Sequence, residues 1–201
     1  MATAPRRMRY TYADYLALED ASPIRHEYLD GEIYAMAGGT PDHAALAVQV
    51  LTLIRGRLPA GCRAFSSDLR IRVPDTGLTT YPDGAVVCGS TQRAVDDLNA
   101  VTNPALLIEV TSPSSEEYDR GEKLRHYQAL ASVREIVIVS HREPALTLHR
   151  RDERGNWERI EVRAGQSIAL AISGAPLLVD DVYRVRAAHA SVSPASPVRL
   201  R

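Results

Sequence analysis

The run Ala-Leu-Leu-Ile-Glu-Val at residues 105–110 restricts the possible folds more than any other segment of this chain. Five of its six residues are apolar, so both faces of the strand that it predicts need to be covered. Residues 135–140 predict a second strand of the same kind, and a helix from about Asp119 to Ala131 is expected between them. The sequence therefore predicts a central sheet with helices on both faces.

Local signals in the first sixty residues predict two helices and a hairpin. Thr11 can cap a short helix that continues through Glu19. The Asp-Gly pair at residues 30–31 is a turn sequence between two β-favouring segments. Thr40 is a candidate N-cap, and Pro41 suits the first position of the helix that follows.

Two longer segments, residues 63–73 and 79–88, predict strands on either side of the turn sequence Pro-Asp-Thr-Gly. If that turn closes a hairpin, the residue numbers of cross-strand partners add up to 151, and Asp68 faces Asp83. Side chains directly opposite each other share a face of the sheet, and like charges there repel. Such a hairpin would bring two acidic side chains together, and their repulsion would have to be offset.

The order of these elements is a helix, a hairpin, an α-β-β-β-α-β core and a trailing peripheral hairpin at residues 145–162. A chain of 201 residues, 45% hydrophobic and 24% charged, has the size and composition of one globular domain. We expect an α/β or α+β fold with a central mixed sheet in a single domain of residues 11–186. A flexible N-terminus of residues 1–10 and a disordered tail of residues 187–201 are expected to flank it.

Composition excludes several classes of protein. The formal net charge is −1, unlike that of a protein whose basic surplus binds nucleic acid. No segment approaches 18 consecutive apolar residues and no signal peptide is recognisable, so we expect a cytoplasmic protein with no membrane contact. Cys62 and Cys88 are too few for a disulfide framework and are expected to be reduced, buried thiols.

Three acidic residues, Asp68, Asp83 and Glu109, are expected to converge on one patch. Glu109 closes the central strand, where an unpaired carboxylate is costly. Because carboxylates at one site repel one another until a cation joins them, the patch is a candidate metal site. Oxygen ligands favour Mg²⁺, with Mn²⁺ as a substitute, and the six histidines and two cysteines show no spacing typical of zinc ligands.

Lys123 is the only lysine in a chain that otherwise uses arginine for its basic side chains. A compact ammonium group suits a place beside a scissile phosphate better than a planar guanidinium does. A second interpretation is an ordinary surface ion pair, because Asp119 lies four residues before Lys123 on the expected helix. Both interpretations remain open at the level of sequence.

Five segments, in order along the chain, resemble the Uma-two family of restriction endonuclease-like proteins, which is assigned to the PD-(D/E)XK nuclease superfamily. The segments are RHEYLDGEIYAMAGGTPDHAAL, SSDLRIRVP, YPDGAVVC, LLIEVTSPSS and YDRGEKLRHY, and the match runs from about Thr11 to Tyr183. The resemblance implies a restriction endonuclease-like fold with the core order given above. It also implies an Mg²⁺-dependent endonuclease that hydrolyses the phosphodiester bonds of DNA.

The resemblance also implies roles for individual residues. Asp83 and Glu109 match the two metal-binding acids of the family. Thr111 stands at the usual lysine position of the superfamily, and Lys123 matches a lysine that the family has moved to the following helix. Asp68, Glu27 and His43 match other recurrent positions of the family and are expected in assisting roles at or beside the metal. Separately from the resemblance, Asp119 lies one turn before Lys123 on the expected helix and is expected to hold the lysine in position.

Two further expectations concern activity and assembly. The net charge gives no general attraction for phosphate, so the alternative is a catalytically silent nuclease-fold module that acts in binding or assembly. If the chain does cut both strands of a duplex, two sites are needed, and a two-fold homodimer is expected.

Overall fold

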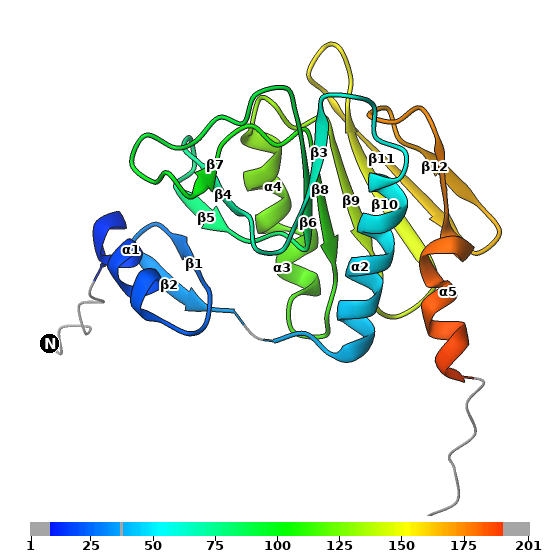
Figure 1. The fold of residues 1–201 in the computed structure, drawn as a ribbon, viewed down its shortest axis with the longest axis horizontal. Helices are drawn as coiled ribbons and strands as arrows, with labels where there is room; N and C mark the ends of the chain where they lie inside the picture. The colour runs from blue at the N-terminus through cyan, green and yellow to red at the C-terminus, as the bar shows by residue number, and fades with distance from the viewer. Residues whose placement is uncertain (1–8, 37, 191–201) are drawn as a thin grey trace, which may run out of the picture.

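Strand β8 (Leu106–Val110) lies in the interior of a six-stranded mixed sheet, as its apolar composition predicts (Figure 1). The computed structural model describes residues 9–36 and 38–190. Strand β8 runs antiparallel to β6 on one side and parallel to β9 on the other. The order across the sheet is β11 (Trp157–Arg163), β10 (Ala145–Arg151), β9 (Glu135–Val139), β8, β6 (Gly84–Cys88) and β3 (Cys62–Ser66).

Helices cover both faces of this sheet, which confirms the predicted mixed α+β class (Figure 1). Helices α2 (Pro41–Arg55) and α5 (Val179–Ala190) pack against one face. Helix α4 (Glu122–Ala129) packs against the other face and follows the short helix α3 (Glu116–Arg120). The hairpin of β10 and β11, expected at the periphery, extends the central sheet through pairing of β10 with β9.

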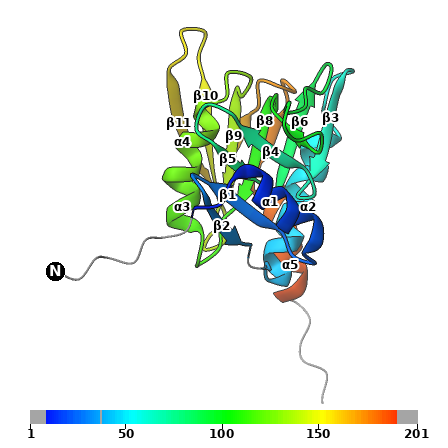
Figure 2. The ribbon, with the colours of Figure 1, turned by 90° about the vertical axis from the view of Figure 1, so that its left-hand side faces the viewer.

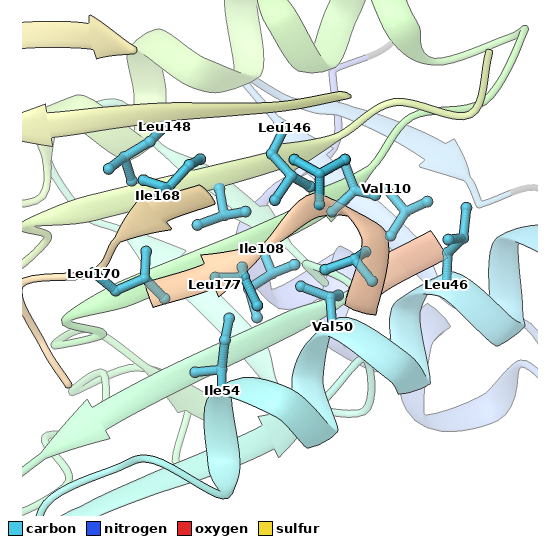
Figure 3. Packing of buried hydrophobic residues seen from close by; sticks show 14 of the residues in the cluster. Leu46, Val50, Ile54, Ile108, Val110, Leu146, Leu148, Ile168, Leu170 and Leu177 are labelled. Atoms are coloured by element: carbon cyan, nitrogen blue, oxygen red, sulfur yellow. The ribbon is translucent and has the colours of Figure 1, made fainter. Parts of the chain in front are cut away.

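The two faces of the sheet have separate apolar cores. Leu106, Ile108 and Val110 pack with the apolar side chains of α2 and α5, and Figure 3 shows this packing from close by. Leu107 belongs to the core on the α4 side. Because successive strand residues point to opposite faces, Glu109 also belongs to the α4 side.

A second, five-stranded sheet covers the α4 side of the molecule, where its apolar residues join the same core as Leu107 (Figure 2). Helix α1 (Tyr12–Ala21) lies beside this second sheet. The strands of the second sheet are, in order, β2 (Glu32–Ala35), β1 (His26–Leu29), β5 (Leu78–Thr80), β4 (Arg70–Val73) and β7 (Ala100–Val101). A separate two-stranded ladder of β12 (Ser167–Ala169) and β13 (Pro176–Leu178) precedes α5.

The local signals near the N-terminus are confirmed. Thr11 caps α1 through a reciprocal capping box. Thr40 caps α2, and Pro41 is the first residue of that helix. Asp30 and Gly31 form the turn between β1 and β2 with φ of 54° and 85°, the positive values that an Asp-Gly hairpin turn requires.

The predicted hairpin of residues 63–88 is correct near its turn and wrong beyond it. Val73 pairs with Leu78, as the sum of 151 requires. Farther from the turn, each predicted strand is broken into two. The halves next to the turn, β4 and β5, belong to the second sheet, and the outer halves, β3 and β6, belong to the central sheet. There β3 and β6 pair with numbers that add up to 150, as in Cys62 with Cys88.

Asp68 therefore does not face Asp83, and that prediction is wrong. Asp68 lies in the turn between β3 and β4, and 76% of its side chain is exposed. Asp83 immediately precedes β6, on the strand that joins the central sheet. A shift of one residue in register, together with the change of sheet, is enough to separate two side chains that a continuous hairpin would place face to face.

The helix expected from Asp119 to Ala131 is divided into α3 and α4 at Gly121. A Cβ atom at Gly121 would lie 2.8 Å from the carbonyl oxygen of Glu117. Glycine thus permits a close approach at the bend, and α4 starts directly after it, one residue before Lys123.

Cys62 and Cys88 form a disulfide between β3 and β6, so the prediction of reduced thiols is wrong. The two cysteines lie directly opposite each other in the antiparallel ladder. This proximity depends on the register and is hidden by a separation of 26 residues in the sequence.

The chain ends differ in part from expectation. Helix α5 extends to Ala190, so residues 187–190 are helical where a disordered tail was expected. The backbone N–H of Tyr10 donates a hydrogen bond to the carbonyl oxygen of Gly31, at 2.8 Å. The rest of the two expected flexible ends, residues 1–8 and 191–201, lies outside the described residues. Across the described ranges, no helix is long and apolar enough to cross a membrane.

Candidate active site

The pairing of β6 with β8 brings Asp83 next to Glu109. Gly84 pairs with Ile108, and the same register continued by one residue places Asp83 opposite Glu109. The backbone N–H of Val110 donates a hydrogen bond to Oδ2 of Asp83, at 2.7 Å. The two acids, 26 residues apart in sequence, are therefore neighbours because two antiparallel strands are adjacent.

Glu109 is held on the α4 side of the sheet, and its residue is only 4% exposed. The hydroxyl of Tyr127 donates a hydrogen bond to Oε1 of Glu109, at 2.5 Å. Tyr127 and Lys123 lie four residues apart on α4, so they occupy the same face of the helix. This face meets the end of β8 where Glu109 stands.

Lys123 is buried among carboxylates, which excludes the surface-pair interpretation. The residue is 4% exposed. Its Nζ atom lies 3.0 Å from Oε1 of Glu109 and 3.0 Å from Oε1 of Glu27. Asp119 Oδ1 is 3.8 Å from the same nitrogen, so the expected i,i+4 pair exists as a third, longer contact.

Glu27 reaches this cluster from β1, in the second sheet. The hydroxyl of Thr80, on the neighbouring strand β5, donates a hydrogen bond to Oε1 of Glu27. Lys123 thus links an acid of the central sheet to an acid of the second sheet. The site lies between the two sheets and depends on both of them.

Burial and charge set the protonation of the cluster. Burial raises the pKa of Glu109 to about 8, although the charge of Lys123 opposes this shift, and the nearby Asp83 raises it further. Burial also raises the pKa of Asp119. For Lys123, burial lowers the pKa, but the surrounding carboxylates, Glu109 first, outweigh it and hold the pKa well above the usual lysine value.

His43 borders the cluster from the first turn of α2, which Thr40 caps. Its Nε2 atom donates a hydrogen bond to the carbonyl oxygen of Val110, at 2.8 Å, and lies 3.3 Å from Oδ2 of Asp83. The interaction with Asp83 raises the pKa of His43, and burial partly opposes this. The start of α2 therefore contacts the end of β8 and the start of β6 at one point.

These side chains line an open cleft with a volume of about 410 Å³. Four acidic residues, one lysine and one histidine border it, together with the serines of the loop after β8. The residues named above that line the cleft are Glu27, His43, Asp83, Glu109, Asp119 and Lys123. Of the seven residues that the sequence singled out, the structure brings these six together and leaves out Asp68.

The nearest partner of Asp68 is Arg25, whose guanidinium forms an ion pair with Oδ1 of Asp68. Both side chains lie toward solvent, with exposed fractions of 43% for Arg25 and 76% for Asp68. Asp68 does not line the cleft that contains Asp83 and Glu109. The role expected for Asp68 at a metal therefore has no geometric support.

Two contributors to the site were missed at the level of sequence. Tyr127 carries a detectable signal, because its spacing from Lys123 places both on one helix face. Thr80 carries none, because its contact with Glu27 joins residues that are 53 positions apart and depends on the pairing of β1 with β5.

Several known proteins are similar to this chain in sequence. Residues 12–178 match the Uma2 family, whose description is "Putative restriction endonuclease". Two uncharacterized proteins of Synechocystis sp. (strain ATCC 27184 / PCC 6803 / Kazusa) are similar. The first, slr1290, is 35% identical over 85% of this chain and 90% of its own length. The second, sll1609, is 30% identical over 64% of this chain and 73% of its own length.

A solved structure shares the fold. It is the crystal structure of a "putative nuclease" from Anabaena variabilis ATCC 29413, and it matches with a TM-score of 0.66 at 18% sequence identity. The match covers 81% of this chain and 92% of that chain. It supports the restriction endonuclease-like fold that the sequence predicted.

Proposed function

We propose that this chain, which belongs to the Uma2 family of nuclease-like proteins, is a metal-dependent endonuclease that hydrolyses DNA. The family and the fold make phosphodiester hydrolysis the first reaction to consider. The observation that carries the proposal is the position of Lys123. A buried ammonium 3.0 Å from Glu109, in a cleft that also contains Asp83, combines the two acids and the cation that such a reaction uses.

The acidic pair fits a hard divalent cation. Mg²⁺ is commonly bound by one or two carboxylates, with water and substrate phosphate completing its coordination. Asp83 and Glu109 provide two carboxylates in one cleft, and burial, followed by the charge of Asp83, raises the pKa of Glu109, which a nearby cation would counteract. Asp83 and Glu109 are the two side-chain ligands of this proposal; among the described residues, no group of three His, Cys, Asp or Glu side chains is arranged to hold a metal.

Three residues of the site then have distinct roles. When bound, a divalent ion would activate water for attack and offset charge on the scissile phosphate. Lys123 offsets negative charge that develops during the reaction, from a nitrogen fixed by Glu27 and Glu109. Tyr127 stabilises the ionised form of Glu109 by hydrogen bonding, and His43 restricts the orientation of Asp83.

A catalytically silent module is the rival proposal, and two observations favour it. The formal net charge of −1 gives DNA no general attraction. Lys123 is also fully engaged by carboxylates, as the lysine of a purely structural ion-pair cluster would be. Such a cluster would stabilise the contact between the two sheets without any chemistry.

Nicking of supercoiled plasmid DNA separates the two proposals. Wild type should convert plasmid to relaxed circles with Mg²⁺ or Mn²⁺ and should be inactive with a chelator. Glu109→Ala removes a metal ligand, and Lys123→Arg replaces the compact ammonium with a larger planar group, so each should lose about two orders of magnitude or more in rate. Asp75→Ala is the matched control, since Asp75 is an exposed acid in the turn between β4 and β5 and does not line the cleft.

Absence of metal-dependent nicking in wild type, or equal nicking by Glu109→Ala, would support the silent module. Cleavage of RNA but not DNA would keep the chemistry and correct the substrate. Retention of full activity in Lys123→Arg would show that a positive charge of any shape suffices at this position.

Assembly belongs to the same proposal. One cleft cuts one strand, so cleavage of both strands of a duplex would use two copies related by a two-fold axis. A homodimer is therefore proposed for the double-strand reaction, and a monomer that only nicks would satisfy the rest of the proposal.

A further inference from the structure

A second cavity, with a volume of about 510 Å³, adjoins the acidic cleft. Both cavities are bordered by His43, Asp83 and Tyr81, so they are continuous parts of one surface. None of the tasks assigned above to the acidic cleft uses the second cavity. Its position beside the cleft means that a chain molecule held in the cleft would extend across it.

One wall of this cavity is apolar and comes from α2. Ala44, Ala47, Val48 and Leu51 stand at helical spacing along this wall. Val48 has 67% of its surface exposed, and Ile24 on the other side of the cavity has 52%. The two alanines leave space, and Val48 presents an exposed apolar side chain to the cavity.

The opposite wall carries planar polar groups. The guanidinium of Arg25 lies over the ring of Tyr81, 5.5 Å from its centroid. Arg25 Nη1 donates a hydrogen bond to the carbonyl oxygen of Ser67, at 2.8 Å, and the ion pair with Asp68 neutralises the arginine. Asp68 thus has a definite place in the structure, which is to hold Arg25 at the edge of the second cavity.

The charge of this cavity argues against a phosphate as its occupant. Arg25 is already paired with Asp68, and Asp83 adds negative charge at the border with the cleft. A neutral, flat ring suits the walls better. Tyr81 is buried beneath Arg25, so the exposed plane on this wall is the guanidinium of Arg25. A guanidinium plane can stack on any nucleobase, and apolar side chains can cover the base without reading its identity by hydrogen bonds.

We propose that the second cavity binds an unstacked nucleobase of the strand whose phosphate occupies the acidic cleft. The proposal rests on the endonuclease function and specifies its substrate. A base inside a regular duplex cannot enter a concave pocket without leaving the stack, so single-stranded or locally unpaired substrates should be preferred. The scarcity of hydrogen-bonding groups on the α2 wall predicts weak discrimination among the bases.

Binding of free nucleosides tests the cavity without any cleavage. The probes are thymidine and deoxyadenosine, with 2-deoxyribose as the probe that lacks a base, and chelator is present throughout. Saturation-transfer NMR should show binding of both nucleosides, strongest at the base protons, and none of the sugar alone. Equal signals for nucleoside and sugar, or no signal at all, would overturn the proposal.

Variants at the wall of the second cavity test whether the nucleosides bind there. Val48→Asp places a charge in the apolar wall and should weaken nucleoside binding by about tenfold or more, the loss expected for one base stack. Val95→Asp is the matched control, because Val95 is fully exposed and lines neither cavity. Ala47→Phe should block the cavity by filling it, and it serves as a second variant at a different position on the same wall.

The outcomes distinguish this proposal from the endonuclease function. Base-dependent binding that Val48→Asp abolishes, in a protein that nicks no DNA, would support the cavity and refute the function. Nicking without base-dependent binding would refute the cavity alone. Unchanged nucleoside binding in both Val48→Asp and Ala47→Phe would also refute it, because the bases would then bind elsewhere.

Discussion

Lys123→Met should destabilise the fold strongly, because it removes the one cation between buried carboxylates and keeps most of the apolar stem. The Nζ atom lies 3.0 Å from an oxygen of Glu27 and 3.0 Å from an oxygen of Glu109. At an effective dielectric constant of about 20, each contact corresponds to about 5 kcal/mol of Coulomb energy. Desolvation offsets much of this, so where both carboxylates are ionised the free energy of unfolding should fall by about 3–5 kcal/mol.

The size of this loss should depend on pH. The charge of Lys123 lowers the pKa of both Glu109 and Asp119, so these values rise further when it is removed. A carboxyl group whose pKa is higher in the folded state costs stability as the pH rises from its unfolded value, about 4, through its folded value. Through Glu109, the wild type stops losing stability above about pH 8, whereas the variant continues to lose it, so the difference between them should be small near pH 5 and larger near pH 9.5.

Urea unfolding measures both effects, at about pH 5 and about pH 9.5. Arg142→Met is the control for an exposed ion pair, since Arg142 lies 2.7 Å from Glu116 with 68% of its side chain exposed. It should cost less than about 1 kcal/mol at either pH. A similarly small cost for Lys123→Met at the higher pH, or a cost that is the same at both, would refute the buried-cluster account.

Three further predictions concern the site and the sheet. At limiting Mg²⁺, the nicking rate should rise with pH through about 8 as Glu109 loses its proton. Tyr127→Phe should move the midpoint of this pH profile upward, because it removes a hydrogen bond that lowers the pKa of Glu109. A rate that falls over this range would contradict that. Asp68→Ala should preserve kcat while Asp83→Ala loses about a hundredfold or more, and an equal loss in both would restore Asp68 as a ligand. Reduction of the disulfide at Cys88 should lower the free energy of unfolding by about 3 kcal/mol, which urea unfolding with and without reductant would check.

The interior of the central sheet was predictable because its signal is local. An apolar run such as residues 105–110 cannot be solvated on either face, so its place in the interior of the sheet follows from composition. Turns and caps were predictable for the same reason. Asp30-Gly31 and Thr40 each determine the backbone within a few residues, and no distant contact is needed.

The position of Asp68 was not predictable, because it depends on two long-range events. The register of the 63–88 segment is correct at its turn, but the strands separate and join different sheets before Asp68 is reached. Nothing in the local pattern marks that change. The disulfide between Cys62 and Cys88 depends on the same ladder and was missed for the same reason.

For Lys123, residue composition alone allowed only part of the prediction. Its status as the only lysine indicated a special position, but the sequence equally allowed a surface pair with Asp119. The tertiary contact with Glu27 decides between them, and that contact requires the second sheet to pack against α4. The break at Gly121, which starts α4 just before Lys123, was also invisible in the helical pattern.

The central claim is that Asp83 and Glu109 together hold the divalent ion of a nuclease site, and crystals soaked with Mn²⁺ test it most directly. Diffraction data collected on either side of the manganese absorption edge should give one anomalous peak within ligand distance of both carboxylates. The same peak should be missing from crystals of Asp83→Asn. Soaked wild-type crystals with no peak in the cleft, or with a peak at Asp68 instead, would contradict the account.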